Sequence, residues 1–373
     1  MFDEHTPLWD IALLFLKLGT TAFGGPAAHI AMLQHEVVER RGWITQEEFL
    51  DHLGASNLIP GPTSTELVIH VGRKRGGWPG LLIAGTCFIL PAAVMVGIIA
   101  WAYVRYGKLP AVSGLLYGVK PVVIAVILQA IWRLGRTAVK SGWLAVVGVI
   151  ALGLSVAGVA PLLVLLAGAA LALAAVVTRP RARAALLAFV NAGLAGSAAV
   201  GLLPIFLVFV KIGAMVFGSG YVLLAFLRAD LVERLGWLNQ QQLLDAVAVG
   251  QVTPGPVFTT ATFLGYLLHG TSGAVAATIG IFVPAFVFVA LSAPLIPKIR
   301  ASRVAGAALD GINVASLALM AVVTWQLARS ALVDWITVAL ALLSALLLFR
   351  FPRLNSAWLI VGAGVIGALR YIV

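Results

Sequence analysis

The chain has 373 residues, of which 61% are hydrophobic and only 10% are charged, and no soluble fold of this size can bury that much apolar surface. Its net charge of +11 does not indicate nucleic-acid binding, because the basic residues lie in short loops between apolar segments, where they set membrane topology. The apolar segments are continuous rather than alternating, which excludes a transmembrane barrel and predicts an all-α integral membrane protein.

We expect no cleavable signal peptide at the start, because residues 1–6 contain Asp3 and Glu4 but no Lys or Arg. A membrane helix is predicted over residues 8–22, and it ends at the break Phe23-Gly24-Gly25-Pro26. An amphipathic helix over 27–41 follows, and Thr45 with Glu48 forms a capping box for a short helix. Longer spans are predicted at about 79–104, 111–132, 143–158 and 161–178.

The stretch Asn57-Leu58-Ile59-Pro60-Gly61-Pro62-Thr63-Ser64-Thr65 predicts a helix, a sharp break and a second helix. Proline disrupts a helix interior but suits the first turn of a new helix, and glycine allows sharp backbone angles. The arms at about 46–57 and 63–72 are too short to cross roughly 30 Å of hydrocarbon, which requires about 20 residues. We therefore predict a re-entrant hairpin with its tip in the protein interior.

The same order of motifs returns later in the chain and predicts two homologous halves, 1–183 and 184–373. The second break is Thr253-Pro254-Gly255-Pro256. The corresponding elements are a span at about 201–218, a hairpin at 240–265, and spans at about 274–296, 304–327, 335–349 and 357–371. Each half then has about five spans and one Pro-Gly-Pro hairpin, which gives about ten transmembrane helices in all.

The basic loops change sides between the halves. In the first half the basic loops come after the hairpin and then after every second span, and the first of them is Arg73-Lys74-Arg75. The second-half counterpart of this loop, His269-Gly270-Thr271-Ser272-Gly273, has no Lys or Arg. Conversely, Lys298, Arg300 and Arg303 lie in a second-half loop of the other parity. Under the positive-inside rule this pattern predicts inverted topology for the two halves. Parallel halves remain the alternative, with strongly basic loops on both sides of the membrane.

The residues at the two breaks predict an oxyanion site. Helix N-termini bind anions through free N–H groups and the helix dipole, and hydroxyls in the first turn add donors. Lys17 and Lys211 occupy equivalent positions in apolar helices, where they either face an anion or extend their ammonium groups to the membrane surface. The candidate substrate-binding residues are Lys17, Gly24, Gly25, Asn57, Gly61, Thr63, Ser64, Thr65, Lys211, Gly218, Ser219, Gln251, Gly255, Thr259 and Thr260.

Glu66 is a candidate for proton coupling, with pairing to Lys17 or capping of a turn as the structural alternatives. Its counterpart is Thr260 or a neighbour, so the two hairpins differ in charge. The recurring pairs Glu39-Arg40 and Glu233-Arg234 predict either ion pairs at the membrane surface or gates. The histidines have no metal-site spacing, so no metal is expected.

These motifs together resemble the chromate ion transporter family. The resemblance is carried by Phe23-Gly24-Gly25-Pro26, Glu39-Arg40-Arg41-Gly42-Trp43, Asn57-Leu58-Ile59-Pro60-Gly61-Pro62 and Thr253-Pro254-Gly255-Pro256, and it covers nearly the whole chain. It implies a multi-pass protein of the cell inner membrane that exports chromate and gives chromate resistance. One departure is Phe217-Gly218-Ser219-Gly220 in place of Phe-Gly-Gly-Pro, which puts the symmetry of the two breaks in question.

The sequence therefore predicts a secondary active transporter that binds chromate near the midplane and moves one half against the other. Sulfate is the expected competitor, because it has nearly the same shape and charge. The alternatives are a sulfate-like oxyanion importer or channel and, in another class, a non-transport membrane scaffold. No nucleotide-binding loop or catalytic constellation is evident, so we expect neither an enzyme nor a cofactor. Membrane lipid is an expected partner, nucleic acid is not, and a homodimer stays open.

Overall fold

The computed structural model describes residues 6–23, 25–107, 109–175, 200–217, 220–292, 303–351 and 354–372. Every regular element in these ranges is a helix, which confirms the all-helical prediction. Among them, the helices long and apolar enough to cross a membrane are Thr63–Tyr106, Val112–Ala138, Val257–Ser292 and Val304–Ala331. The total of about ten spans stays a prediction, and the boundary between 183 and 184 lies outside the described residues.

The described helices follow the expected order in both halves. In the first half they are α1 Leu8–Thr21, α2 Gly25–Gln34, the π-helix η1 His35–Arg40, α3 Gln46–Ser56, α4 Thr63–Tyr106, α5 Pro110–Ala138, α6 Gly142–Val156 and α7 Pro161–Ala174. In the second half they are α9 Leu202–Met215, η2 Gly220–Val222, α10 Leu223–Leu227, η3 Arg228–Arg234, α11 Gln240–Val252, η4 Val257–Thr259, α12 Thr260–Ser292, α14 Arg303–Ala331, α15 Trp335–Arg350 and α16 Ser356–Ile372.

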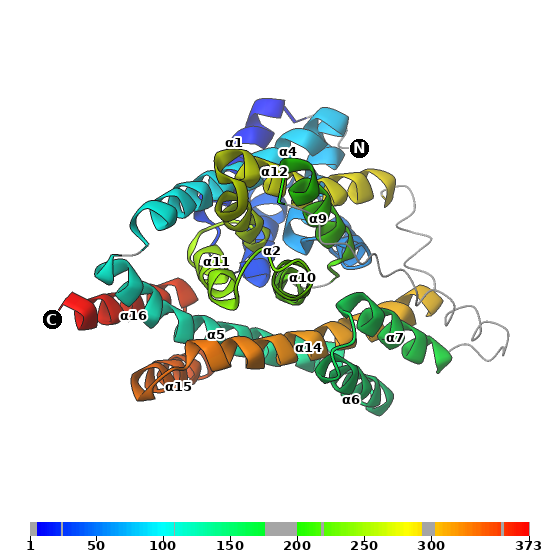
Figure 1. Ribbon diagram of the computed structural model, residues 1–373. Coiled ribbons are helices and arrows are strands. Elements are labelled where there is room, and N and C mark those ends of the chain that lie inside the picture. Colours follow the sequence, from blue (N-terminus) through cyan, green and yellow to red (C-terminus); the bar gives the residue numbers. More distant parts are fainter. Residues whose placement is uncertain are drawn as a thin grey trace.

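The helices form two layers that do not coincide with the two halves (Figure 1). One layer, called the core layer here, consists of α1–α4 and α9–α12, in which α4 packs against α12, α1 against α4 and α9 against α12. The other, called the frame layer, consists of α5–α7 and α14–α16. Most of the packing lies within each layer, and each layer contains helices from both halves of the chain.

Within the frame layer the halves exchange partners. Helix α5 packs against α15 and α16 of the second half, and its counterpart α14 packs against α6 and α7 of the first. The closest crossings are at Gly118 and Gly311, where an added Cβ would collide with the carbonyl oxygens of Ala363 and Gly168. Small residues at these crossings allow the helix backbones to approach each other closely, as in membrane helix packing generally.

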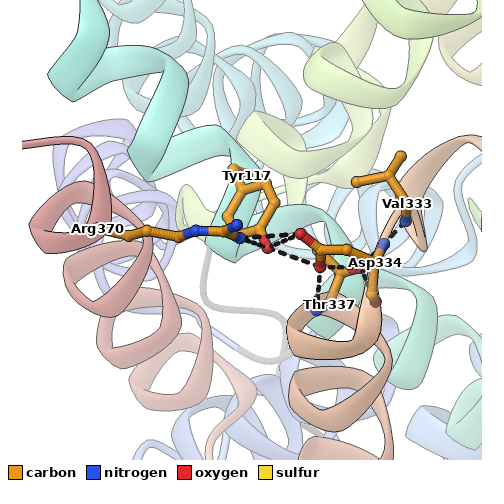
Figure 2. A network of polar contacts seen from close by, with 5 residues as sticks. All are labelled: Tyr117, Val333, Asp334, Thr337 and Arg370. Carbon is orange, nitrogen blue, oxygen red and sulfur yellow. Dashed lines mark hydrogen bonds and ion pairs between the residues drawn. The ribbon is translucent and has the colours of Figure 1, made fainter.

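Helices α5 and α14 run antiparallel. At one end, Lys140 after α5 lies 2.7 Å from Asp310 near the start of α14. At the other end, Tyr117 near the start of α5 donates a hydrogen bond of 2.6 Å to Asp334, which follows α14 (Figure 2). Asp334 also accepts from the Thr337 N–H at 2.9 Å and pairs with Arg370 of α16 at 2.9 Å, so one carboxylate caps α15 and joins three helices of the frame layer.

Both long helices of the core layer contain a sharp turn. Gly77 in α4 has φ +59° and Gly270 in α12 has φ +61°, and helical dihedrals are lost at these positions. The segments before and after each turn touch, because an added Cβ on Gly72 would lie 2.5 Å from the Gly80 carbonyl oxygen. A short arm, 63–75 in α4, is thus separated from the longer span that follows it, which agrees with the predicted division.

Both hairpins begin with a capping box. In α3, Thr45 accepts from the Glu48 N–H at 3.1 Å and Glu48 accepts from the Thr45 N–H at 3.0 Å, as predicted. In α11, Asn239 and Gln242 make the same exchange at 2.8 and 2.9 Å. The two arms therefore begin in the same way, but the first box carries a charge and the second is neutral.

Candidate functional site

The two Pro-Gly-Pro breaks meet in the core layer and are tied reciprocally to the opposite half. The Gly61 N–H donates to the Val216 carbonyl oxygen at 2.7 Å, and the Gly255 N–H donates to the Ala22 carbonyl oxygen at 2.9 Å. Ala22 and Val216 follow the last residues of α1 and α9, so each break satisfies an unpaired carbonyl at the end of the other half's first helix. These two amides are engaged within the protein.

Glycine is required at the centre of each break. Gly61 has φ +142° and Gly255 has φ +93°, a region that side chains disfavour. An added Cβ would also collide with Glu66 Oε1 at Gly61 and lie 2.7 Å from the Ala92 Cβ at Gly255. The backbone conformation and the close packing of the breaks both depend on these two residues.

A small, largely enclosed cavity of about 10 Å³ lies where the breaks meet. That volume holds about one water molecule, so the structure leaves no room there for a larger ligand. The lining residues are Pro26, His29, Pro62, Thr63, Ser64, Gly220, Pro256, Val257 and Phe258. The cavity thus lies between the two breaks and the first residues of α2 and η2. These two helices begin at the glycine-rich tracts.

The polar side chains in this lining come from the first half. His29 is buried; its Nε2 lies 2.9 Å from the Ala22 carbonyl oxygen and its Nδ1 lies 3.4 Å from Ser64 Oγ. A carbonyl can only accept, so the neutral ring donates from Nε2 and accepts the Ser64 hydroxyl at Nδ1. At the positions after Pro256 the second half has Val257 and Phe258.

Two candidate lysines lie away from this cavity and are paired with carboxylates. Lys17 Nζ is 2.8 Å from Glu36 and Lys211 Nζ is 2.9 Å from Asp230. The proposed alternative that Glu66 pairs with Lys17 is wrong in this structure, because neither Glu66 carboxylate oxygen has a hydrogen-bond partner among the described residues. A direct role of Lys17 and Lys211 toward an anion stays a prediction.

The recurring pairs are Glu39-Arg40 and Glu233-Arg234. Each member contacts a residue other than its neighbour in the pair. Arg40 bonds to Glu36 at 3.1 Å and Arg234 to Asp230 at 2.8 Å. Glu39 instead contacts His35 at 2.8 Å, and Glu233 pairs with Arg228.

Each central carboxylate is outnumbered by basic groups, because Glu36 contacts Lys17, Arg40 and Arg41, and Asp230 contacts Lys211 and Arg234. Burial raises the pKa of Glu36, but Lys17 and Arg40 lower it by a larger amount, so the pKa lies below its ordinary value. The carboxylate stays ionised and the two clusters carry surplus positive charge. Glu36 and Asp230 were missed as site residues, although their equivalent positions in the repeat were a visible signal.

The remaining candidates divide by their surroundings. Thr259 and Thr260 donate their hydroxyls to the Pro256 and Val257 carbonyl oxygens, both at 2.8 Å. Asn57 is exposed at the end of α3, and Gln251 is half-buried with an unpartnered Nε2.

Thr65 is buried, and its Oγ1 has no hydrogen-bond partner among the described residues. Gly25 begins α2 with φ +76°. Gly24, Gly218 and Ser219 lie outside the described residues.

A buried ion pair that sequence reasoning missed connects the halves. Lys120 Nζ of α5 lies 2.7 Å from Asp245 of α11, and the Tyr103 hydroxyl donates to the same carboxylate at 2.8 Å. All three groups come from different helices of the two layers. The signal available in the sequence was Lys120 itself, a single basic residue inside a long apolar segment.

Duplicated, mostly apolar helices that break and meet at a closed central cavity define a membrane protein of the transporter class. Residues 9–173 and 203–368 each match the family model described as chromate transporter, so the chain belongs to that family. This result confirms the resemblance and the presence of two repeats.

Curated relatives match over nearly the whole chain. A chromate transport protein of Cupriavidus metallidurans is 33% identical over 98% of this chain and 93% of its own length. A chromate transport protein of Pseudomonas aeruginosa is 32% identical over 95% of this chain and 90% of its own. A probable chromate transport protein of Synechococcus elongatus is 31% identical over 97% and 95%. No solved structure matches the chain.

Proposed function

We propose that this protein is a secondary active transporter that exports chromate across the cell inner membrane. The single observation that carries the proposal is the closed cavity between the two Pro-Gly-Pro breaks, whose polar wall contains His29, Thr63 and Ser64. The family and the printed functions of the relatives support chromate as the substrate.

The anion would bind at the N-terminus of α4 when this cavity is enlarged. Pro62 precedes the first turn of α4, which places the positive end of the helix dipole beside Thr63 and Ser64. Chromate is a tetrahedral dianion and is larger than the water-sized cavity, so the structure corresponds to a closed state without room for it. Transport then requires the breaks to separate.

The two layers suggest how they separate. Packing is extensive within the core layer and within the frame layer, and the helices that connect them, such as α5 and α11, touch over a smaller area. We propose that the core layer moves against the frame layer and opens the cavity to alternate sides, in place of one sequence half rocking on the other. The antiparallel course of α5 and α14 supports opposite membrane orientations for the two halves.

The two basic clusters would attract the anion toward the site. Lys17 and Arg40 have side chains more than half exposed, so their surplus charge acts on ions in water at the membrane surface. Such attraction does not distinguish chromate from sulfate, because the two dianions have nearly the same charge and shape. Sulfate should therefore compete with chromate.

The test is uptake of radiolabelled chromate into everted membrane vesicles, with and without a proton gradient and with sulfate as competitor. Saturable uptake blocked by sulfate is expected, and Thr63→Val, which copies Val257, should raise the chromate KM about two- to fivefold. Val257→Thr is the reciprocal variant, and it should not raise KM because it adds a hydroxyl to the lining.

Two results would overturn the proposal. Absence of saturable uptake by an inserted, folded protein would favour a scaffold or another anion. Flux that rises linearly with chromate concentration and ignores gradients would favour a channel.

A further inference from the structure

Glu66 occupies an unusual position beside the first break. Its side chain is fully buried, and within the described parts of the chain neither carboxylate oxygen has a hydrogen-bond partner. The carboxyl group lies against the backbone of Gly61, because an added Cβ there would collide with Oε1. A buried carboxyl group without a partner is costly when ionised, so its protonation responds to any charge placed nearby. The cavity is such a place, because Pro62, Thr63 and Ser64, which line it, immediately precede this turn of α4.

Two histidines continue from Glu66 between the hairpin arms. His70 lies one helical turn beyond Glu66 on α4 and is buried, with an unpartnered Nε2. Its ring stacks on that of His52 in α3, with centroids 5.2 Å apart and planes inclined by 20°. His52 Nδ1 is also buried without a partner among the described residues. Both rings therefore present a nitrogen that is able to take up or release a proton.

The outer end of this series is open to water. Glu48 lies one turn before His52 on α3, and Lys74 lies one turn after His70 on α4. The two pair at 3.1 Å across the arms, with side chains 38% and 50% exposed. Titratable groups thus follow one face of each arm, from the exposed ion pair to the buried Glu66 at the break.

Other charged groups on the surrounding elements are already engaged. Arg73 of α4 donates to carbonyl oxygens of Val289 and Ala290 in α12. Lys17 of α1 is held by Glu36, and His29 of α2 is bonded to Ala22 and Ser64. Asp51 of α3 also has an interaction partner. Among the described residues, His52 and His70 are the titratable groups that we place between Glu66 and the exposed Glu48–Lys74 pair.

The second hairpin shows that this series is not needed to build the fold. It has the same capping box, break and turn, but Gln242 and Ala246 stand where the first has Glu48 and His52. The turn at Gly270 aligns with that at Gly77, which places Phe263 and Leu267 opposite His70 and Lys74. Threonine replaces Glu66. A hairpin of this shape therefore forms without any of the titratable side chains.

We propose that the first hairpin conducts protons between the Glu48–Lys74 pair and Glu66 through His52 and His70. A proton from water binds His52, passes to His70 and then to a Glu66 oxygen, and each imidazole returns to its neutral form. The step from His52 to His70 crosses between the stacked rings, whose centroids are 5.2 Å apart, and the step from His70 to Glu66 covers about one helical turn. One bridging water closes a gap of that size.

This path couples protons to the proposed substrate. An ionised Glu66 would repel a dianion at the adjacent break, so anion binding favours the protonated form and, reciprocally, protonation favours the anion. The inference rests on the proposed chromate transport. It adds that protons accompany the anion and identifies their route. Since an inward proton gradient opposes this outward movement, the export must be driven by another gradient, such as that of chromate itself or of an exchanged anion.

The experiment uses the purified full-length protein in liposomes with a pH-sensitive dye inside. Chromate flux and proton flux are recorded together after a chromate gradient is imposed. Wild type is expected to move protons with chromate. Glu66→Gln should lower proton flux per chromate on the order of tenfold while exchange of chromate for chromate continues. His70→Phe, which copies Phe263, and His52→Ala, which copies Ala246, should slow proton flux in the same sense.

His35→Ala is the matched control, because this exposed histidine contacts Glu39 outside the path. It should leave both fluxes unchanged, and chromate's own protonation is the same for every variant. Chromate flux without proton flux in wild type, or undiminished proton flux in both Glu66→Gln and His70→Phe, would overturn the inference and leave the transport proposal standing. Absence of chromate flux in wild type would instead count against the transport proposal itself.

Discussion

At the central cavity the first hairpin presents Thr63 and Ser64, whereas the second presents Val257 and Phe258. The backbones nevertheless match, since each break has a glycine with positive φ that donates to a carbonyl of the opposite half. The comparison separates two requirements. Both repeats contribute a break to the cavity, while the polar side chains in its lining are supplied by one of them.

The largest expected effect concerns an aspartate that recurs in both hairpins. Asp245 is buried against Lys120 and Tyr103, whereas its equivalent, Asp51, is half-buried. Asp245→Asn leaves Lys120 as an uncompensated buried charge, so the free energy of unfolding should fall by about 3–5 kcal/mol. Thermal unfolding in detergent measures this loss.

Asp51→Asn is the comparison variant and should cost far less. Adding Lys120→Met to Asp245→Asn should recover most of the stability, because the buried charge is then removed. Equal losses for the two aspartates would show that the halves are more alike here than the structure indicates.

The next effect tests what the halves share. Gly61→Ala and Gly255→Ala should each impose about 1–3 kcal/mol of backbone strain and displace the breaks, so both should reduce chromate transport by roughly tenfold or more. Gly42→Ala and Gly236→Ala are matched controls, with φ of +59° and +62° but open space around them. Vesicle uptake normalised to inserted protein is the measurement. A loss of transport confined to one of the two variants would contradict the equivalent role of the two breaks.

A smaller effect is expected at the basic clusters. Lys17→Ala and Lys211→Ala should weaken chromate uptake about two- to fivefold with normal insertion, because Arg40 and Arg234 still neutralise the carboxylates. The loss should shrink as salt is added, since exposed charges are screened. Uptake curves at low and high salt measure it. Unchanged uptake at low salt would remove the lysines from the anion's path.

The smallest effect compares the two capping boxes. The pKa of Glu48 is lowered, first by the Thr45 N–H and then by Lys74, against an opposing effect of burial. A lowered pKa in the folded state means that this stabilisation is present at neutral pH and is lost as pH falls through that value.

Acid should therefore loosen the first hairpin before the second, whose Asn239–Gln242 box is neutral. Proteolysis or hydrogen exchange of α3 against α11 measures the difference. Glu48→Gln should reduce the difference between the two hairpins, and an undiminished difference would show that another titratable group is responsible.

Local features of this fold were predictable from the sequence, and long-range partners were not. The Pro-Gly-Pro breaks, the Thr45–Glu48 box and the order of helices follow from residues that act on their own backbone. The partner of Lys17 lies beyond a glycine-rich break, and that of Asp245 lies in the other half. Such pairs depend on how helices are placed, which helical periodicity does not determine.

The second repeat is one residue shorter than the first between the break and the turn: Gly61 and Gly77 are 16 positions apart, whereas Gly255 and Gly270 are 15 apart. This difference has a structural explanation. In the first half α4 begins directly after Pro62, but in the second the tighter helix η4 precedes α12. A 3₁₀ turn advances further per residue than an α turn, so fewer residues connect the break to the following arm. The sequence showed only that a residue was missing somewhere before the next span.

The exchange of partners between α5 and α14 bears on how the protein is made. When the first half has been synthesised, α5 has been inserted but α15 and α16, against which it packs, do not yet exist. The glycine face of α5 at Gly118 must then stay exposed to lipid or to the insertion machinery until the last helix arrives. Biogenesis should consequently pass through a half-molecule whose hairpin is complete but whose α5 still lacks its partners α15 and α16.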